Sequence, residues 1–153
     1  MAYASKLPGP DGRYAYSPQE DATWGALFDR QMRTLPGRVA PAYLDGVAKL
    51  GLKRDRVPQI AEIDARLAAL TGAGVEGVPA IIPPSQFFDL LSRRRFPVAT
   101  FLRRPEDMDY IEEPDIFHEV FGHCPLLTDP AYADFIERFG KIAVTLGKPY
   151  SWR

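Results

Sequence analysis

The chain has 153 residues, of which 46% are hydrophobic and 25% charged, and its net charge is −1. This length is typical of one domain with a buried core, and the composition is that of an ordinary globular protein. A net charge so close to zero gives no electrostatic reason to expect a nucleic acid or a membrane as partner. The basic run at 93–95 is the one exception, and a solvated face is its simpler interpretation.

The number of cysteines and the hydropathy of the chain indicate the cellular compartment in which the protein works. The single cysteine excludes an internal disulfide and fits a reducing environment. The first residues lack the apolar core of a signal peptide, and no stretch approaches the length of a membrane span. We therefore expect a cytoplasmic protein.

The first half of the chain predicts an arm followed by three helices. Residues 1–16 are rich in Gly, Pro and Tyr without any period, which favours an extended arm. Ser17 and Glu20 form a capping box with Pro18 at the first helical position, so a helix begins there and ends near residue 36. Apolar residues at helical spacing predict two more helices, over 41–51 and 60–72.

The middle of the chain breaks the helical pattern. Four breakers between residues 75 and 84 predict a short strand or an extended loop. A short helix is expected from Ser85, and a strand over 96–102 in which Pro97 favours an edge or a bulge. The fold class is therefore mainly α with one or two short β-strands.

The last predicted helix has the clearest period in the sequence. Asp129 is its expected N-cap, Pro130 its first residue and Gly147 its end. Its apolar positions are Tyr132, Phe135, Ile136, Phe139, Ile142, Ala143 and Leu146.

Both histidines of the chain, His118 and His123, lie in the segment 114–125. Two imidazoles that converge on one ion form a metal-ligand pair. On an ideal α-helix the second would be rotated by about 140° from the first. We therefore expect Gly122 to take the left-handed conformation that ends helices, so that His123 folds back toward His118, and Pro125 to prevent the helix from resuming.

The residues alone leave alternatives open. The two histidines are either ligands or structural residues. Asp115 or Glu119 is a candidate for the carboxylate that orients an imidazole by accepting its second N–H group. Cys124 as a soft ligand would favour zinc, and a zinc hydrolase, although small buried cysteines are commoner.

A family resemblance narrows these alternatives. The segment 114–125, which reads Pro-Asp-x-x-His-Glu-x-x-Gly-His-x-Pro, resembles the signature of the pterin-dependent aromatic amino acid hydroxylases. Further segments resemble the bacterial phenylalanine 4-hydroxylases in the same order, so that the resemblance runs from about residue 15 to 147. These segments are 23–31, 35–38, 55–58, 94–98 and 125–127.

The resemblance implies a site that binds Fe(II) and tetrahydrobiopterin and hydroxylates L-phenylalanine to L-tyrosine with O₂. His118 and His123 match the two histidines of the family's iron site, which also uses a glutamate. Phe87 matches the aromatic ring that stacks on the pterin, and Ala80 and Ile82 match the loop whose backbone meets the pterin edge.

Three charged residues complete the implied site. Glu119 matches an acidic position near the pterin and is the candidate catalytic residue. Arg103 matches the arginine that takes the substrate carboxylate, and Asp115 would hold that arginine. Without the resemblance, a core residue at Phe87 and a surface arginine at 103 would be the simpler interpretations.

The departures from the family matter as much. The third iron ligand of the family is a glutamate on a later helix, and no residue before Arg153 matches it. We therefore interpret residues 17–153 as the N-terminal part of the hydroxylase catalytic domain, incomplete at the C-terminus and monomeric. A non-catalytic remnant is the alternative. The apolar face of the last helix should then be exposed, because its partner would belong to the missing part.

Overall fold

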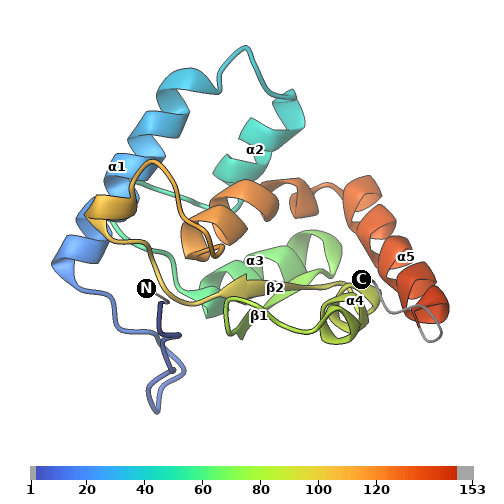
Figure 1. The fold of residues 1–153 in the computed structure, drawn as a ribbon. Helices are drawn as coiled ribbons and strands as arrows, with labels where there is room; N and C mark the ends of the chain where they lie inside the picture. The colour runs from blue at the N-terminus through green and yellow to red at the C-terminus, as the bar shows by residue number, and fades with distance from the viewer. Residues whose placement is uncertain (1–2, 148–153) are drawn as a thin grey trace.

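The computed structural model of the protein describes residues 3–147 and is mainly helical (Figure 1). Residues 3–16 contain neither a helix nor a strand. The α-helices are α1 (Pro18–Thr34), α2 (Pro41–Lys49), α3 (Ile60–Thr71), α4 (Pro84–Ser92) and α5 (Pro130–Leu146). The strands are β1 (Gly74–Val78) and β2 (Arg95–Ala99). Shorter helical turns are η1 (Pro105–Asp107), η2 (Phe117–His123) and η3 (Pro125–Thr128).

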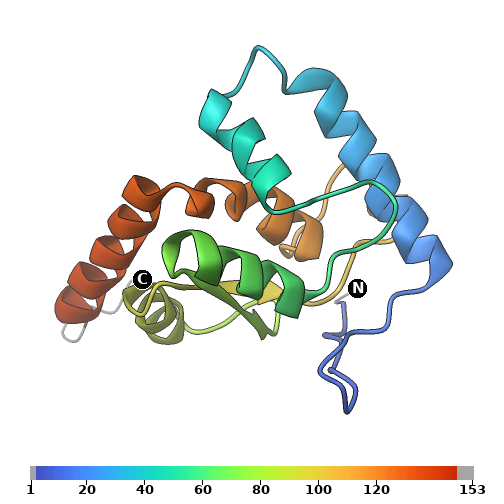
Figure 2. The same cartoon turned by 180° about the vertical axis from the view of Figure 1, so that it is seen from behind.

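The two strands form a small parallel sheet. Val75 pairs with Phe96 and Val78 with Ala99, and α4 makes the crossover between the strands. Both strands are edges, which agrees with the position of Pro97. Seen from behind, α3 lies in front of the sheet (Figure 2). The expected mainly α fold with short strands is confirmed.

Several local predictions are confirmed at the helix ends. The Ser17–Glu20 capping box is formed at the start of α1, and the Asp129 carboxylate accepts the N–H of Ala131 at the start of α5. Gly72 ends α3 in the left-handed conformation, with φ 73°. Leu70, an apolar residue in the last turn of α3, is 42% exposed and so departs from the buried apolar face of that helix.

The core gathers around the histidine segment η2. Trp24 of α1 is fully buried, its ring meets Phe117 edge-on at 5.1 Å, and its Nε1 donates to the carbonyl of Lys53. Phe117 stacks on Phe121 with ring centroids 4.8 Å apart. The apolar face of η2 is thus fixed inside the core, which leaves its other face for the histidines.

The helix containing the histidines differs from the expectation. η2 is a π-helix, whose i→i+5 hydrogen bonds bring residues five apart onto one face. Gly122 is not one of the described glycines that have a positive φ, so the backbone makes no left-handed break at this position. Cys124 keeps helical dihedrals and Pro125 begins the next turn, η3. The predicted break was therefore wrong: the helix widens where a break was expected, and Pro125 does not end the helical path.

Helix α2 supports this widened turn from outside. The Tyr43 hydroxyl donates to the carbonyl of Phe121, in the middle of η2. Gly46 lies directly against η3: a Cβ at this position would overlap the Pro125 carbonyl group, with its carbon only 2.6 Å away. The close approach of α2 to the end of the histidine segment thus requires glycine.

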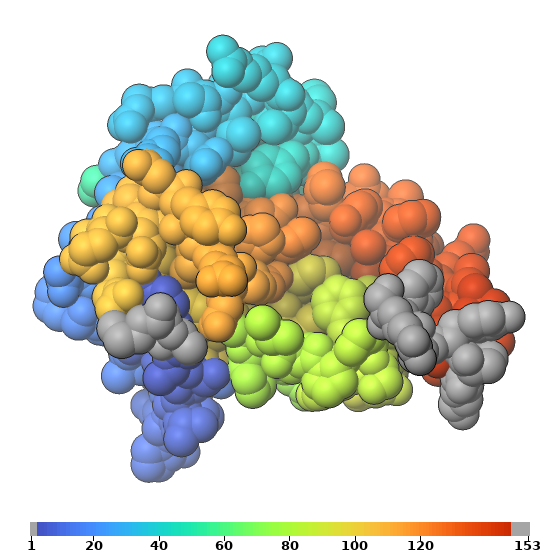
Figure 3. All heavy atoms as spheres, in the orientation of Figure 1, coloured from blue at the N-terminus to red at the C-terminus, as the bar shows by residue number. Residues whose placement is uncertain are grey.

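The N-terminal arm lies against the segment that follows β2 (Figure 3). The Tyr3 ring stacks on Phe101 with centroids 4.8 Å apart. The Thr100 hydroxyl accepts the backbone N–H of Lys6 and donates to its carbonyl. Among residues 3–147, no helix is long and apolar enough to cross a membrane.

Replacing Gly46 by alanine should lower the free energy of unfolding by about 1–3 kcal/mol, because the added methyl group overlaps backbone that cannot move without displacing η3. Urea denaturation measures this change. A variant as stable as the parent would show that the α2–η3 contact is loose.

Replacing Gly122 by alanine is the matched test of the widened turn. A Cβ at Gly122 meets no atom within 4 Å, and its backbone is not left-handed. The variant should therefore keep the stability of the parent or exceed it by up to about 1 kcal/mol. A large loss in the same urea experiment would restore the left-handed interpretation of this position.

Candidate metal and cofactor site

The structure brings the two histidines together. The Nε2 atoms of His118 and His123 are 3.3 Å apart, and their ring centroids are 5.1 Å apart. Two nitrogens at this separation, each about 2.1 Å from one divalent ion, subtend an angle of about 100° at the ion. That angle suits either tetrahedral or octahedral coordination, so the pair has the geometry of two ligands of one metal ion.

The surroundings keep His123 in the form that binds metals. The ring is half-buried, and burial followed by the neighbouring His118 lowers the pKa of His123 below its ordinary value. A neutral imidazole offers a lone pair to an ion. Phe96 of β2 lies 5.1 Å from the His123 ring. His118 is exposed, so the pair is accessible to an ion.

A third protein ligand is not found near the pair. Within residues 3–147, no group of three or more His, Cys, Asp or Glu side chains could hold a metal ion. Cys124 is fully buried in the core, and burial raises the pKa of its thiol far above the ordinary value. Its complete burial in the core favours a small core residue over a zinc ligand.

The Asp115 carboxylate connects two segments of the site. It is fully buried and accepts the Nε and Nη2 groups of Arg103 at 2.8 and 3.0 Å. It also accepts the backbone N–H groups of Arg103 at 3.0 Å and of His118 at 2.9 Å. Its bond to His118 is to the backbone, so the hypothesis that Asp115 orients the imidazole directly is wrong.

Arg103 is not a surface arginine, because only 11% of its side chain is exposed. Its guanidinium lies over the Phe117 ring at 5.8 Å, and Nη1 donates to the carbonyl of Met108. Of the five N–H groups of the side chain, two bind Asp115 and one binds Met108. Two N–H groups therefore remain for a ligand such as a carboxylate.

A cleft of about 360 Å³ brings together the residues predicted to bind the pterin. The loop 79–84 and α4 form one side of the cleft, and the segment that begins η2 forms another; Figure 3 shows the two segments in lime green and orange. The lining residues are Val78, Ala80, Ile81, Ile82, Pro84, Phe87, Phe88, Pro97, Pro114 and Glu119.

Glu119 is the only titratable residue among those that line this cleft. Burial, and secondarily the charge of Asp115, raise the pKa of Glu119 to about 7. A carboxyl group with such a pKa can both hold and release a proton near neutral pH. Among residues 3–147, the His118 and His123 rings hydrogen-bond only to each other, and the neighbours of Glu119 in the cleft are apolar.

Sequence reasoning missed part of the cleft. Phe88 lies in the short helix expected from Ser85 and is not among the predicted site residues, whereas its ring lines the cleft and meets Phe87 edge-on at 5.4 Å. Pro97 and Pro114 were interpreted as a strand edge and as part of the signature. The position of Pro97 beside the segment that follows β1 depends on the parallel pairing of β1 with β2, which no local pattern reveals.

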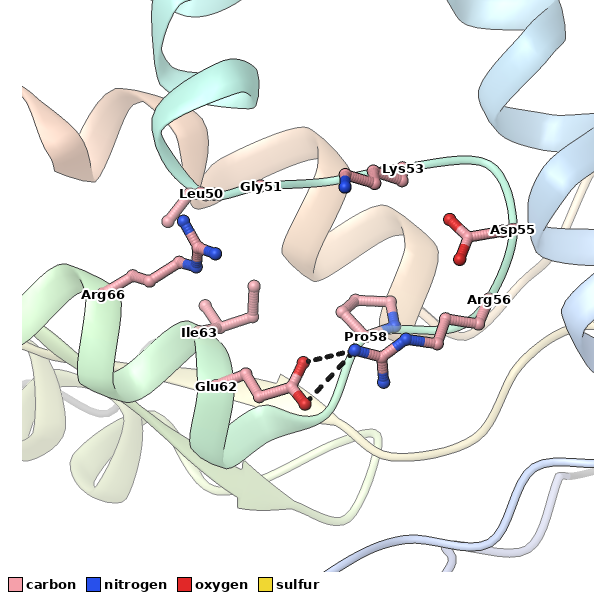
Figure 4. Close-up of a pocket in the computed structure, with 9 residues that line it drawn as sticks. All are labelled: Leu50, Gly51, Lys53, Asp55, Arg56, Pro58, Glu62, Ile63 and Arg66. Atoms are coloured by element: carbon pink, nitrogen blue, oxygen red, sulfur yellow. Dashed lines mark hydrogen bonds and ion pairs between the residues drawn. The ribbon is translucent and has the colours of Figure 1, made fainter.

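Another hollow, of about 170 Å³, lies between the connector 50–58 and α3 and contains none of the predicted site residues (Figure 4). Charged side chains of both signs line it, and the Arg56 guanidinium is neutralised by Glu62 at 3.1 Å. The histidine pair and the adjacent cleft remain the candidate functional site.

Replacing Asp115 by alanine should lower the free energy of unfolding by about 3–5 kcal/mol, because Arg103 would be left as a buried charge without its partner. Urea denaturation again gives the value. The control is Asp89→Ala, which removes an exposed pair with Arg93 and should cost about 0.5 kcal/mol or less. Similar losses in both variants would contradict the central position of Asp115.

Comparison with known proteins identifies the family. A family model described as biopterin-dependent aromatic amino acid hydroxylase matches residues 1–149. The phenylalanine-4-hydroxylase of Pseudomonas aeruginosa is 47% identical over 146 residues, which are 95% of this chain and 56% of that protein. The enzyme of the same name from Vibrio cholerae is 46% identical over 92% of this chain and 48% of its own length.

Solved structures agree with this assignment. The apo phenylalanine hydroxylase of Colwellia psychrerythraea superposes with a TM-score of 0.92 at 45% identity, over 95% of this chain and 56% of that one. The Chromobacterium violaceum enzyme with bound iron(III) and 7,8-dihydrobiopterin has a TM-score of 0.85 at 42% identity, over 96% and 52%. The chain spans about half the length of these relatives, and it belongs to the biopterin-dependent aromatic amino acid hydroxylases.

Proposed function

We propose that this chain provides the iron-binding histidines and the pterin cleft of a monooxygenase that hydroxylates L-phenylalanine to L-tyrosine with O₂, Fe(II) and tetrahydrobiopterin. The observation that carries the proposal is the convergence of His118 and His123, with Nε2 atoms 3.3 Å apart, beside the cleft that contains Glu119. The similar proteins whose names specify phenylalanine support the choice of substrate.

The residues present fit both groups. Two imidazoles are suitable ligands for iron, and the apolar cleft with one aromatic wall suits a flat heterocycle. When bound, iron and reduced pterin supply the oxidising power, while the protein binds and orients the reactants. Fe(II) stands low in the affinity order of divalent metals, so two ligands alone should hold it weakly.

Each cleft residue then has a defined task. Phe87 offers its ring face to the pterin, and the backbone of Ala80 and Ile82 offers polar groups to the pterin edge. Glu119 exchanges a proton near this edge, since its pKa is close to 7. Outside the cleft, the two remaining N–H groups of Arg103 bind the carboxylate of the amino acid. Asp115 holds the Arg103 guanidinium in place through two hydrogen bonds.

The proposal also covers the setting of the reaction. The reactants are small molecules, and neither a membrane nor a nucleic acid is required. A reducing cytoplasm would keep iron as Fe(II) and Cys124 as a thiol. We propose a monomer that acts in the breakdown of phenylalanine.

A non-catalytic remnant is the second candidate. It is favoured by one observation, the absence of a third ligand side chain around the histidine pair within residues 3–147. The two candidates differ in whether the pair and the cleft bind iron and pterin at all, which can be measured without turnover.

Replacing either His118 or His123 by alanine should weaken Fe(II) binding at least tenfold, because a single imidazole cannot chelate an ion. Anaerobic calorimetry measures this affinity, and Glu106→Gln, an exposed acidic position on the loop, is the control. If both histidine variants bind as well as the parent, the pair is not the metal site.

Replacing Phe87 by alanine should weaken the binding of 7,8-dihydrobiopterin about tenfold through loss of the stacking surface. Tyr110→Ala, which removes a 77% exposed ring, should change nothing. Dihydrobiopterin that binds equally to all three proteins would remove the cleft from the site.

Tyrosine formation from L-phenylalanine, tetrahydrobiopterin, Fe(II) and O₂ tests the activity itself. The 153-residue chain alone should form little or none, because two ligands hold iron weakly. Sustained turnover would show that two histidines suffice.

A further inference from the structure

One carbonyl group in the widened turn lacks the donor that an α-helix would give it. In an α-helix the carbonyl of Phe121 would accept the N–H group of residue 125, four positions later. Residue 125 is proline, which has no N–H group and whose ring would collide with that carbonyl. The sequence therefore disfavours an ordinary α-helical turn at this point, and the structure has the π-helix η2 immediately before the proline.

Helix α2 supplies a donor in place of the missing one. The Tyr43 hydroxyl donates to the carbonyl of Phe121, and the two rings meet edge-on with centroids 6.1 Å apart. Three residues further along α2, Gly46 lies against the carbonyl of Pro125. Residues three apart lie on the same face of a helix. One face of α2 therefore contacts both residues between which proline prevents the backbone hydrogen bond.

The bond from Tyr43 lies within the spacing that matters for the histidines. Phe121 falls between His118 and His123, and the π-helical spacing is what brings their Nε2 atoms to 3.3 Å. Phe121 is buried, so its carbonyl would be costly to leave without a donor. Loss of the hydroxyl should therefore favour rearrangement of the turn, which would move the imidazoles apart.

We infer that Tyr43 is a positioning residue of the metal site: its hydroxyl replaces the N–H group that Pro125 lacks and thereby keeps His118 and His123 at a chelating distance. The inference rests on the proposed function and deepens it. Tyr43 acts through the backbone of Phe121, so its effect is on the geometry of the histidine pair.

The test compares Tyr43→Phe with Tyr16→Phe in the 153-residue chain. Each variant removes one tyrosine hydroxyl that donates to a backbone carbonyl, that of Phe121 or that of Thr100. Burial raises the pKa of both hydroxyls, to about 12 at Tyr43. The two variants should therefore lose similar stability in urea, whereas only Tyr43→Phe should affect the histidine pair.

The probe is Cu²⁺, which stands highest in the affinity order of divalent metals and so should bind measurably to two imidazoles. Calorimetry should show about three- to tenfold weaker binding to Tyr43→Phe, the equivalent of one lost hydrogen bond. The electron paramagnetic resonance spectrum of the bound ion should show weaker coupling to a second imidazole nitrogen. Tyr16→Phe should match the parent in both measurements, and His118→Ala gives the background. Equal binding by Tyr43→Phe and the parent, or an equal loss in Tyr16→Phe, would overturn the inference.

A second variant tests the link to proline. Pro125→Ala restores an N–H group that can reach the Phe121 carbonyl. Tyr43→Phe made in that background should therefore cost less Cu²⁺ affinity than it does in the parent. Strictly additive effects would show that the hydroxyl does not replace the missing N–H group.

Amide hydrogen exchange separates this inference from the proposed function, because it needs no metal. Exchange within residues 119–124 should be faster in Tyr43→Phe than in the parent and in Tyr16→Phe. Unchanged exchange would contradict the role of Tyr43. Faster exchange in a chain whose Cu²⁺ binding does not depend on the histidines would contradict the proposed function and would still support Tyr43 as the residue that holds the turn.

Discussion

The site depends on one buried carboxylate. Removing Asp115 from water is costly, and the cost is offset only because four N–H groups and the Arg103 charge surround it. These bonds fix the loop that follows β2 to the first turn of the histidine helix. Without this connection, Arg103 and His118 would belong to two independent segments. The position of Arg103 relative to the histidine pair is therefore set by a carboxylate that binds the backbone of His118 and leaves its imidazole free.

The second constraint is the width of the histidine helix. An α-helix would direct His118 and His123 about 140° apart, whereas the π-helical turn brings their Nε2 atoms within 3.3 Å. Such a turn is less favourable than α-helix in isolation, so surrounding contacts must maintain it. Phe117 and Phe121 are held in the core on one side, and the Tyr43 hydroxyl binds the Phe121 carbonyl on the other. The scaffold helices α1 and α2 thus help to hold His118 and His123 together although they contain neither histidine.

Much of this architecture is predictable from local sequence, and the remainder is not for identifiable reasons. The capping box at Ser17 and the left-handed Gly72 follow from rules that involve only neighbouring residues. The widened turn at 117–123 was misinterpreted as a break, because glycine and proline resemble a helix end while tertiary contacts keep the helix going. The family resemblance indicated Ala80, Ile82, Phe87 and Glu119 as neighbours, and they line one cleft. The depth at which Arg103 is buried and the part played by Phe88 depend on packing between distant segments, which no periodicity encodes.

Within residues 3–147, two features leave a favourable interaction unmade: the exposed apolar row of α5 and the histidine pair. A helix that is seated by Gly140 on α4 and still exposes Phe135, Phe139, Ile142 and Leu146 loses the free energy that burial of these side chains would supply, about 1.5–3 kcal/mol for each one fully buried. Two imidazoles with no third ligand side chain among residues 3–147 should likewise hold Fe(II) only weakly. Phe88 contacts Phe139 and lines the cleft, so both deficits occur on one continuous surface.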